Sequence, residues 1–376
     1  MMDRANILII GGGVIGCAIA QAVSQRWDDV FLVEQNPKLG MATSTRNSGV
    51  IHSGIYYPQN SLKARLCIEG LRLMYEFCSK HNVPHRHTGK LVVAVDAREE
   101  AALAALKKNG EANGVDGLRL VGPEEIRARE PHIAGVAALE VSSTGIVSAE
   151  DLVRTYARLA ADHGANIVPH AKVVSLTAQP GAIHVGLRIG DAENAQDEII
   201  EARYVINAAG LYADEVAALL GNKSWRIYPV RGEYCEIRGP RRSLINGLVY
   251  PLPHVDALSL GVHFTKTLWG TVLLGPTARY VEGKDNYERD RLAIADFVRG
   301  AQPLLPEVEE ADLQLGYSGL RPKLVPPDGK GYADFVITRD ANVPQAIHLV
   351  GMESPGLTAA PAIAGYVAKM VEEMMD

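Results

Sequence analysis

The sequence predicts a mixed fold, α/β with α+β character, in which a parallel sheet is interrupted by an inserted antiparallel sheet. Short apolar runs, typical of buried parallel strands, occur at residues 7–10, 204–207 and 347–350. Between residues 226 and 274, short β runs broken by prolines predict the antiparallel sheet. With 376 residues, the chain is long enough for two domains.

The glycine-rich stretch after the first strand has the spacing of a dinucleotide-binding loop. Gly11 allows a tight turn, Gly13 lets backbone N–H groups approach a pyrophosphate, and Gly16 lets the next helix pack closely on the sheet. This helix directs its positive N-terminal end at the phosphates. The loop therefore predicts the first half of a nucleotide site.

The second strand completes this unit, because residues 30–34 are apolar and end on Glu34. Glu34 follows Gly16 at close to the roughly 20 residues expected for an acid that accepts hydrogen bonds from the adenosine ribose hydroxyls. Its carboxylate would repel a 2′-phosphate. We therefore expect a dinucleotide without that phosphate.

Composition excludes several other classes of protein. A net charge of −6 gives no electrostatic reason to bind nucleic acid or an anionic membrane surface. No apolar run reaches the roughly 20 residues of a membrane helix, and no residue cluster has metal-ligand spacing. The four cysteines lack Cys-x-x-Cys spacing, which favours structural thiols in a reducing, cytoplasmic compartment. The apolar N-terminus is interpreted as nucleotide-binding strand and helix, not as a signal peptide.

Periodicity places the other elements along the chain. Helices are expected at residues 61–80, 99–112, 123–129 and 150–164, and strands at residues 89–96, 165–168 and 172–178. A terminal helix is expected to begin near Thr358, with Pro361 in its first turn. The resulting division gives a discontinuous nucleotide domain, residues 1–82, 146–224 and 317–376, and a substrate-binding domain, residues 83–145 and 225–316.

Four segments together resemble the FAD-dependent D-amino-acid-oxidase (DAO) superfamily: Gly11-x-Gly13-x-x-Gly16, residues 43–49, residues 207–210 and residues 351–358. Within it, residues 46–57 and the run from Leu260 to Thr265 are most similar to L-2-hydroxyglutarate dehydrogenases. The His-x-Gly-x-x-Tyr pattern at His52 also occurs in FAD-dependent glycerol-3-phosphate dehydrogenases. The segment 351–357 departs from the pattern expected for hydroxyglutarate enzymes. The resemblance implies a Rossmann-like FAD-binding domain with an inserted substrate domain.

The resemblance also implies which residues hold FAD, which we expect to be bound non-covalently. Hydroxyl, backbone and guanidinium groups of residues 44–46 suit the pyrophosphate, and N–H groups of residues 356–358 suit the negative charge of reduced flavin. The resemblance assigns Val173 to the adenine. The full set of cofactor-binding candidates is Gly11, Gly13, Val14, Ile15, Gly16, Glu34, Gln35, Thr43, Ser44, Thr45, Arg46, Asn47, Ser48, Gly49, Val173, Ala208, Ala209, Gly210, Arg321, Gly351, Ser354, Pro355, Gly356, Leu357 and Thr358.

Arg321 is the strongest substrate-binding candidate. It stands in Gly-Leu-Arg-Pro, which resembles the superfamily segment whose arginine grips a substrate carboxylate with its planar fork. Lys323 is a candidate for a distal carboxylate. Tyr56, Tyr250 and Tyr317 are candidates for substrate hydrogen bonds.

His52 and His263 are the two candidates for the base. Oxidation of a 2-hydroxy acid requires removal of the hydroxyl proton, and a histidine that titrates near neutrality suits this task. One of them is expected to act as the base while the other orients the substrate, and the sequence does not rank them.

These residues predict an FAD-dependent enzyme that oxidises a small L-2-hydroxy acid by hydride transfer to flavin N5, with L-2-hydroxyglutarate, oxidised to 2-oxoglutarate, as the favoured substrate. The alternatives are a glycerol-3-phosphate dehydrogenase or oxidase, an amino-acid oxidase, and a flavin-binding protein without turnover. The electron acceptor (quinone, oxygen or another carrier) and a peripheral association with a membrane are left open.

Overall fold

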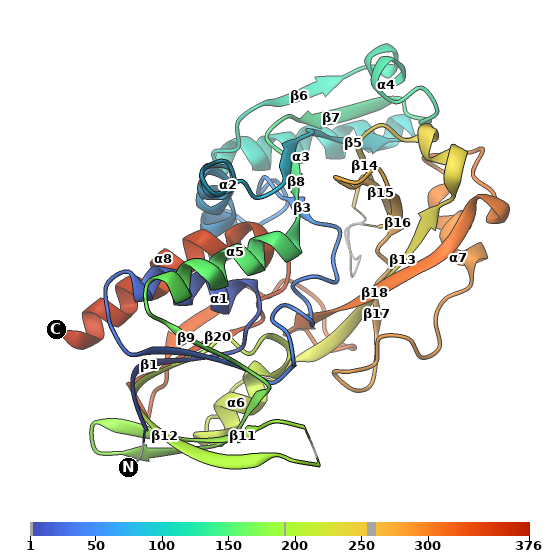
Figure 1. The fold of residues 1–376 in the computed structure, drawn as a ribbon. Coiled ribbons are helices and arrows are strands. Elements are labelled where there is room, and N and C mark those ends of the chain that lie inside the picture. The colour runs from blue at the N-terminus through green and yellow to red at the C-terminus, as the bar shows by residue number, and fades with distance from the viewer. Residues whose placement is uncertain (1–2, 192, 254–260) are drawn as a thin grey trace.

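A computed structural model describes residues 3–191, 193–253 and 261–376, and these form two large sheets and one small one (Figure 1). The first sheet has eight strands in the order β10-β11-β12-β1-β2-β9, and β20 joins β12 and carries β19. Its parallel strands are β1 (Asp3–Ile10), β2 (Val30–Glu34), β9 (Asn166–Pro169), β12 (Gln196–Asn207) and β20 (Ala346–Val350). Antiparallel neighbours are β10 (Ala171–Gln179), β11 (Ala182–Ile189) and β19 (Val336–Arg339).

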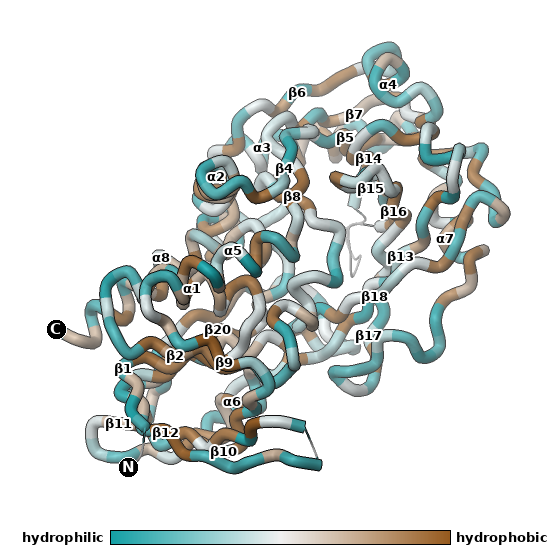
Figure 2. Tube along the Cα trace, viewed as in Figure 1, coloured by the Kyte–Doolittle hydropathy of each residue, from teal (hydrophilic) through white to brown (hydrophobic). Residues whose placement is uncertain are grey.

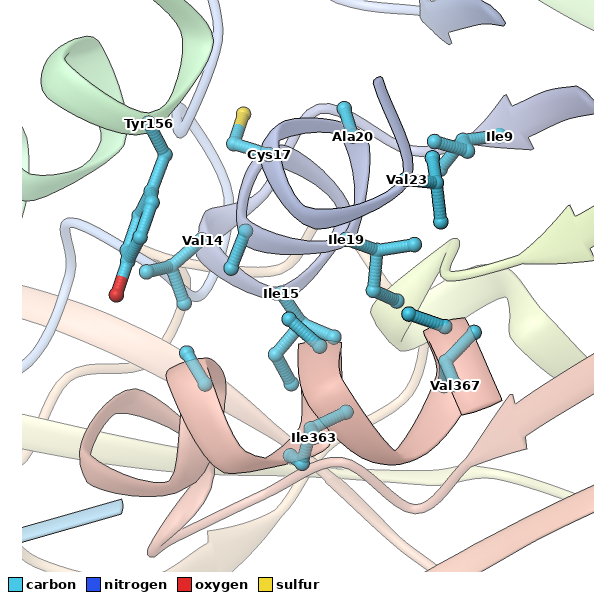
Figure 3. Packing of buried hydrophobic residues seen from close by; sticks show 14 of the residues in the cluster. Ile9, Val14, Ile15, Cys17, Ile19, Ala20, Val23, Tyr156, Ile363 and Val367 are labelled. Carbon is cyan, nitrogen blue, oxygen red and sulfur yellow. The ribbon is translucent and has the colours of Figure 1, made fainter. Parts of the chain in front are cut away.

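Helices cover one face of this sheet. They are α1 (Val14–Ser24), α5 (Ala149–Asp162) and α8 (Gly356–Met375), with α2 (Leu62–His81) packed outside α8. Figure 3 shows Ile15 of α1 against Ile363 of α8, and Tyr156 of α5 beside Val14. Alternate residues of β1, such as Leu8, face the other side, where the β10–β12 strands and α6 (Ala213–Leu219) cover them. Hydrophobic residues accordingly concentrate in the strands of this sheet (Figure 2).

The second sheet has nine strands in the order β17-β13-β16-β15-β14-β5-β7-β6, with β18 on the free edge of β13. All of its pairs are antiparallel except β5 with β14. The strands are β5 (Lys90–Ala94), β6 (Leu118–Val121), β7 (Ala137–Val141), β13 (Tyr228–Ile237), β14 (Leu248–Pro251), β15 (His263–Lys266), β16 (Val272–Gly275), β17 (Arg279–Tyr280) and β18 (Leu313–Lys323).

A small sheet of β3 (Val50–Ile51), β8 (Gly145–Val147) and β4 (His85–His87) lies between the large ones (Figure 1). The remaining helices are α3 (Glu100–Ala112), α4 (Pro123–Arg129) and α7 (Ile294–Ala301), and short 3-10 turns occur at Ala97–Glu99, Gly210–Tyr212, Gly239–Leu244 and Glu310–Asp312. The mixed α/β fold class is confirmed.

Two local expectations are corrected. The terminal helix begins at Gly356, two residues before the expected start near Thr358. Pro361 is therefore the sixth residue of the helix and lies beyond its first turn, at a position where an amide would normally bond to the carbonyl of Leu357. Leu260, one of the residues in the family-like run, lies outside the described residues.

The two-domain division remains a proposal, supported by the sheets. Strands of the first sheet come from the start, middle and end of the chain, as the three nucleotide segments require. The boundary at residue 317 falls inside β18, which pairs with β13. A junction after Lys323 fits the sheets better.

Within the described part of the chain, no helix combines the length and apolar character needed to cross a membrane. The four cysteines are free and buried.

Candidate active site

A cavity of about 1170 Å³ extends from the glycine loop of the first sheet to β13, β15 and β18 of the second. Most of the predicted site residues line it. They are Gly11, Gly13, Val14, Ile15, Glu34, Gln35, Thr43, Ser44, Arg46, Asn47, Ser48, His52, Tyr56, Ala208, Ala209, Gly210, Tyr250, His263, Arg321, Lys323, Ser354, Pro355, Gly356 and Leu357.

Seven predicted residues lie outside this lining: Gly16, Thr45, Gly49, Val173, Tyr317, Gly351 and Thr358. Several of them have structural bonds instead. Thr45 Oγ1 donates to the Gly40 carbonyl at 2.8 Å, and Tyr317 Oη donates to the Asn47 carbonyl at 2.7 Å. Val173 packs at the edge of the core on the β10 face of the first sheet.

The glycine loop is held close to both neighbouring strands. Gly11 has φ +109°, and a Cβ there would lie 2.5 Å from the carbonyl oxygen of Ala208. At Gly16, a Cβ would lie 1.9 Å from the carbonyl oxygen of Gly11. Both contacts exclude a side chain, so the helix and the end of β12 approach the loop as the sequence predicts.

Glu34 is buried at the end of β2, with three hydrogen bonds. Its Oε2 accepts from the Gly12 amide at 2.7 Å, and its Oε1 accepts from the backbone and side-chain nitrogens of Asn36 at 2.8 and 2.6 Å. A carboxylate has about four lone-pair sites. One site, on Oε2, therefore remains for a ribose hydroxyl.

The 43–49 loop forms hydrogen bonds to both sides of the cavity, to the start of α1 and to β18. Ser44 Oγ accepts from the Val14 amide at 2.9 Å, at the start of α1. Thr43 Oγ1 donates to the Leu320 carbonyl of β18 at 2.9 Å. The Arg46 guanidinium lies 4.4 Å from the centre of the Tyr287 ring and lines the cavity, where it can face a phosphate.

A buried hydrogen-bond network supports the end of β12. Asn207 Nδ2 lies 3.0 Å from His348 Nδ1, and His348 Nε2 lies 3.1 Å from Asp340 Oδ2. The Asn207 side-chain oxygen accepts from the Ala209 amide at 3.2 Å. These bonds fix the small residues 208–210 beside the glycine loop.

The start of α8 meets the start of α1 at the cavity. A Cβ at Gly356 would lie 3.4 Å from Ile15 Cδ1, and both residues line the cavity. Thr358 is buried in the first turn and binds the histidine loop, because its Oγ1 accepts from the His52 amide at 2.9 Å. Thr358 therefore positions His52 against this helix.

Arg321 reaches the cavity from β18. Its Nη1 donates to the Thr277 carbonyl at 3.2 Å, and its guanidinium lies flat against Gly232 of β13. A Cβ at Gly232 would lie 2.9 Å from both terminal nitrogens. The remaining N–H groups of the fork are available for a carboxylate.

Beside Arg321 lies an ion cluster that includes two residues not identified from the sequence. Lys63 Nζ is 3.0 Å from Glu353 Oε1, and Lys323 Nζ is 3.3 Å from Glu353 Oε2. Burial alone would raise the pKa of Glu353, but the two lysines hold it below its usual value. The sequence does carry one signal for Lys63, which lies among the apolar residues on the buried face of its helix. A lysine at such a position is almost never buried unless it is paired with an anion.

His52 and His263 both line the cavity. His263 stacks on Tyr250 with ring centres 3.7 Å apart, and its Nδ1 lies 2.9 Å from the Gly261 carbonyl. Since a carbonyl only accepts, Nδ1 carries the hydrogen and Nε2 holds the lone pair of the neutral ring. The Nδ1 of His52 is buried without a hydrogen-bond partner.

Both histidines have a pKa below the near-neutral value expected from the sequence. Burial, followed by the positive charge of Lys90, lowers the pKa of His52 to about 3. Burial also lowers the pKa of His263 to about 3, with Lys90 and Arg321 acting in the same direction. Both rings are therefore neutral near pH 7, which is the form that accepts a proton.

The residues present fit FAD. The cavity exceeds the roughly 300–1,000 Å³ of common small-ligand sites, so it has room for a dinucleotide and a substrate. Its glycine end has the close backbone approach, the free acceptor on Glu34 and the helix N-terminus that an adenosine diphosphate group needs. Among the described residues, no cluster suits a metal ion.

Fold and cavity together define a dinucleotide-dependent oxidoreductase. The profile of the FAD-dependent oxidoreductase family (DAO) matches residues 6–370, and the chain belongs to this family. It is 32% identical to the mitochondrial L-2-hydroxyglutarate dehydrogenase of Bos taurus, over 98% of this chain and 89% of that protein. It is also 32% identical to the L-2-hydroxyglutarate dehydrogenase of Indibacter alkaliphilus, over 97% and 98% of the two chains.

Solved structures agree with this assignment. The chain is similar to the dithionite-reduced L-alpha-glycerophosphate oxidase of Mycoplasma pneumoniae with FAD bound, with a TM-score of 0.88, 29% identity, and 99% and 95% of the two chains covered. The fold is also that of glycine oxidase from Geobacillus kaustophilus, with a TM-score of 0.82, 21% identity, and 99% and 95% covered.

Proposed function

We propose that this FAD-dependent oxidoreductase oxidises L-2-hydroxyglutarate to 2-oxoglutarate. The observation that carries the proposal is that one cavity contains the dinucleotide loop, the guanidinium of Arg321 and two histidines that are neutral near pH 7. The relatives named L-2-hydroxyglutarate dehydrogenase, which match nearly the whole chain, support the choice of substrate.

Arg321 would bind the C1 carboxylate of the substrate. Its fork is held by the Thr277 carbonyl on one side and the Gly232 backbone on the other, so it presents a fixed orientation to the anion. When bound, FAD supplies the two-electron acceptor, with N5 as the atom that takes the hydride. A carboxylate held at Arg321 would limit the orientations open to the C2 hydrogen, and a second contact to the substrate hydroxyl would select one of them.

His52 would accept the hydroxyl proton. Its ring lines the cavity, and its Nδ1, which is buried, has no hydrogen-bond partner in the protein. His263, already bonded to Gly261 and stacked on Tyr250, suits the orienting role. A ring that is neutral at pH 7 has the free lone pair that this step needs, whereas a pKa of about 3 makes it a weaker base than an ordinary histidine.

The Lys63–Glu353–Lys323 cluster favours a dicarboxylate. It carries two positive charges and one negative charge, and Arg321 adds a further positive charge beside it. A substrate with a second carboxylate would balance this excess. We assign Lys323 and Lys63 to that distal carboxylate.

Turnover with an artificial electron acceptor tests the substrate. We expect the purified holoenzyme to form 2-oxoglutarate from L-2-hydroxyglutarate, with the D enantiomer, glycerol 3-phosphate and L-amino acids far slower. Arg321→Lys should lower kcat/KM by about 100-fold while FAD stays bound, because lysine keeps the charge and loses the fork. Preference for glycerol 3-phosphate or an amino acid, or unchanged kinetics in Arg321→Lys, would reject this assignment.

We also propose that FAD is held without a covalent bond and that the protein works in the cytoplasm. The four buried thiols, free in the structure, support a reducing compartment. Release of all flavin on denaturation checks the first point, and fractionation of the native cell checks the second.

A further inference from the structure

Lys90 places a buried cation behind the cavity. It is the first residue of β5, its side chain is fully buried, and it forms no ion pair with any carboxylate among the described residues. Burial lowers the pKa of Lys90 to about 7. Burying an ammonium group without a carboxylate partner destabilises the fold. We therefore expect Lys90 to have a role other than stabilising the protein.

Two cavity tyrosines enclose this ammonium group. Lys90 Nζ lies 4.6 Å from the centre of the Tyr56 ring and 4.8 Å from the centre of the Tyr250 ring. It also donates to Tyr56 Oη at 3.4 Å. Both tyrosines line the cavity, whereas Lys90 itself does not, so the charge acts on the cavity through them.

The direction of the Lys90 hydrogen bond determines whether the Tyr56 hydroxyl can act as a donor toward a ligand. In its protonated form Lys90 only donates, so the Tyr56 oxygen accepts from it and the Tyr56 hydrogen is left for another acceptor. Within the described residues, this hydrogen has no acceptor. A hydroxyl that accepts from a cation is also a stronger donor, because each bond polarises the next.

The charges around the pair favour an anion as that acceptor. Lys90 contributes to the low pKa of both His52 and His263, so its field reaches the histidine end of the cavity. Tyr250 stacks on His263, which places the second tyrosine between Lys90 and that ring. A negative oxygen in this part of the cavity therefore meets a neutral ring pair and a polarised hydroxyl.

We propose that Tyr56 donates a hydrogen bond to an anionic oxygen of the bound 2-hydroxy acid, and that Lys90 is the positioning residue that orients and polarises this hydroxyl. The pair forms an oxyanion contact in addition to Arg321. The inference rests on the proposed function for the identity of the anion, and only on the cavity for the contact itself.

Lys90→Met, Tyr56→Phe and the double variant test this pairing in the FAD-loaded protein. Each single variant should reduce its flavin about 10- to 100-fold more slowly with subsaturating L-2-hydroxyglutarate, the range expected for a lost charge-assisted bond. The double variant should lose little more than either single one, because the two residues act as a unit. Lys266→Met, on β15 and outside the cavity lining, is the control and should keep the wild-type rate.

Thermal unfolding separates this role from a structural one. Lys90 is buried without a carboxylate partner, so its replacement with methionine should leave the temperature of the unfolding midpoint equal or higher. The rate of flavin reduction should fall in the same variant. A lower midpoint in Lys90→Met with a wild-type reduction rate would overturn the proposal. So would additive losses in the double variant.

Anion binding gives a readout that does not depend on turnover. Succinate, which has no hydroxyl to oxidise, should perturb the flavin absorbance of the wild type, with about 10-fold weaker binding in both single variants. If the wild type fails to react with any 2-hydroxy acid yet shows this pattern, the proposed function fails and the anion contact stands. Equal succinate affinity in the wild type and both variants would overturn the contact.

Discussion

Gly232 shows how a single missing side chain shapes the site. It pairs with Gly319 across β13 and β18, so this part of the sheet has no side chains. The Arg321 guanidinium occupies the space beside Gly232, and the Arg46 carbonyl occupies the space beside Gly319, 2.0 Å from where a Cβ would lie. The two glycines therefore let the cofactor loop and the substrate arginine lie against the same sheet.

Gly232→Ala should displace the arginine fork without unfolding the protein. The new methyl group would lie 2.9 Å from both terminal nitrogens, and a shift of about 1 Å in a positioning group costs about 100-fold in rate. We expect kcat/KM for L-2-hydroxyglutarate to fall about 100-fold, measured by steady-state kinetics with bound FAD quantified. Gly122→Ala, where a Cβ meets no atom within 4 Å, is the control. Equal kinetics in both variants would show that Arg321 needs no such gap.

Individual site residues could be predicted from the sequence where they belong to a local motif. Gly11, Glu34 and Arg321 stand in motifs with fixed spacing, and all three line the cavity. Gly232 and Glu353 carry no such pattern. Their roles depend on which strand or helix end lies opposite, and this is a property of the tertiary structure.

At the scale of the element, β13 carries two different surfaces on its two faces. Gly232 and Tyr234 face the cavity, whereas Arg231 and Glu233 point the other way and are fully buried. Arg231 lies 3.0 Å from Glu233, and Glu233 also accepts from Arg291 at 3.0 Å and from the Leu292 amide at 2.9 Å. This network holds the segment before α7 against the back of the strand.

Arg231→Met should destabilise the protein strongly. Removal of one partner leaves a buried carboxylate with fewer compensating charges, at a cost of about 3–5 kcal/mol in the free energy of unfolding. Chemical denaturation of the FAD-loaded protein measures this change. Arg188→Met, which breaks an exposed pair with Asp197, should alter the same curve little. Similar curves for the two variants would contradict the structural role of the buried network.

Helices with clear periodicity or flanking signals were predicted well, whereas the polar first half of one long strand was not. The helices at residues 62–81 and 123–129 agree with expectation, because their apolar spacing or flanking signals are clear. β12 extends from Gln196, well before the expected run at 204–207, because its first half is mostly polar and exposed. Apolar pattern alone does not detect a strand of that kind.

At the scale of the whole molecule, burial in the folded protein keeps His52 and His263 in their neutral form. Their folded pKa of about 3 lies below the ordinary value of 6.5, so the unfolded chain takes up protons first as the pH falls. The stability that this neutrality provides is present above pH 6.5 and is lost progressively toward pH 3.

Acid should therefore destabilise the wild type more than a variant without these rings. Between pH 8 and pH 5, each histidine should account for about 1–2 kcal/mol of lost stability. Comparing the pH dependence of unfolding for the wild type and His52→Asn/His263→Asn, both loaded with FAD, isolates this contribution from that of the other histidines. Parallel curves for the two proteins would mean that neither ring is held neutral by burial.

The overall architecture was predictable because its pieces are repeated locally: apolar strand, glycine turn and helix at the start, and a strand, turn and helix at the end. Most residues of the cavity between the sheets were predicted through the family resemblance, because local patterns alone do not bring together β2, β13, β15, β18 and the start of α8 from across the chain. Only this assembly places the arginine and the histidines at the end of the site opposite the glycine loop.

Anaerobic addition of L-2-hydroxyglutarate to the purified yellow protein tests most directly whether this cavity holds FAD and an anionic 2-hydroxy acid in reacting positions. We expect the oxidised flavin band to bleach with no other component present, and 2-oxoglutarate to appear in an amount equal to the flavin reduced. Two results would contradict this expectation. In the first, the flavin band persists with L-2-hydroxyglutarate but bleaches with glycerol 3-phosphate or an amino acid. In the second, none of a broad panel of substrates bleaches the band.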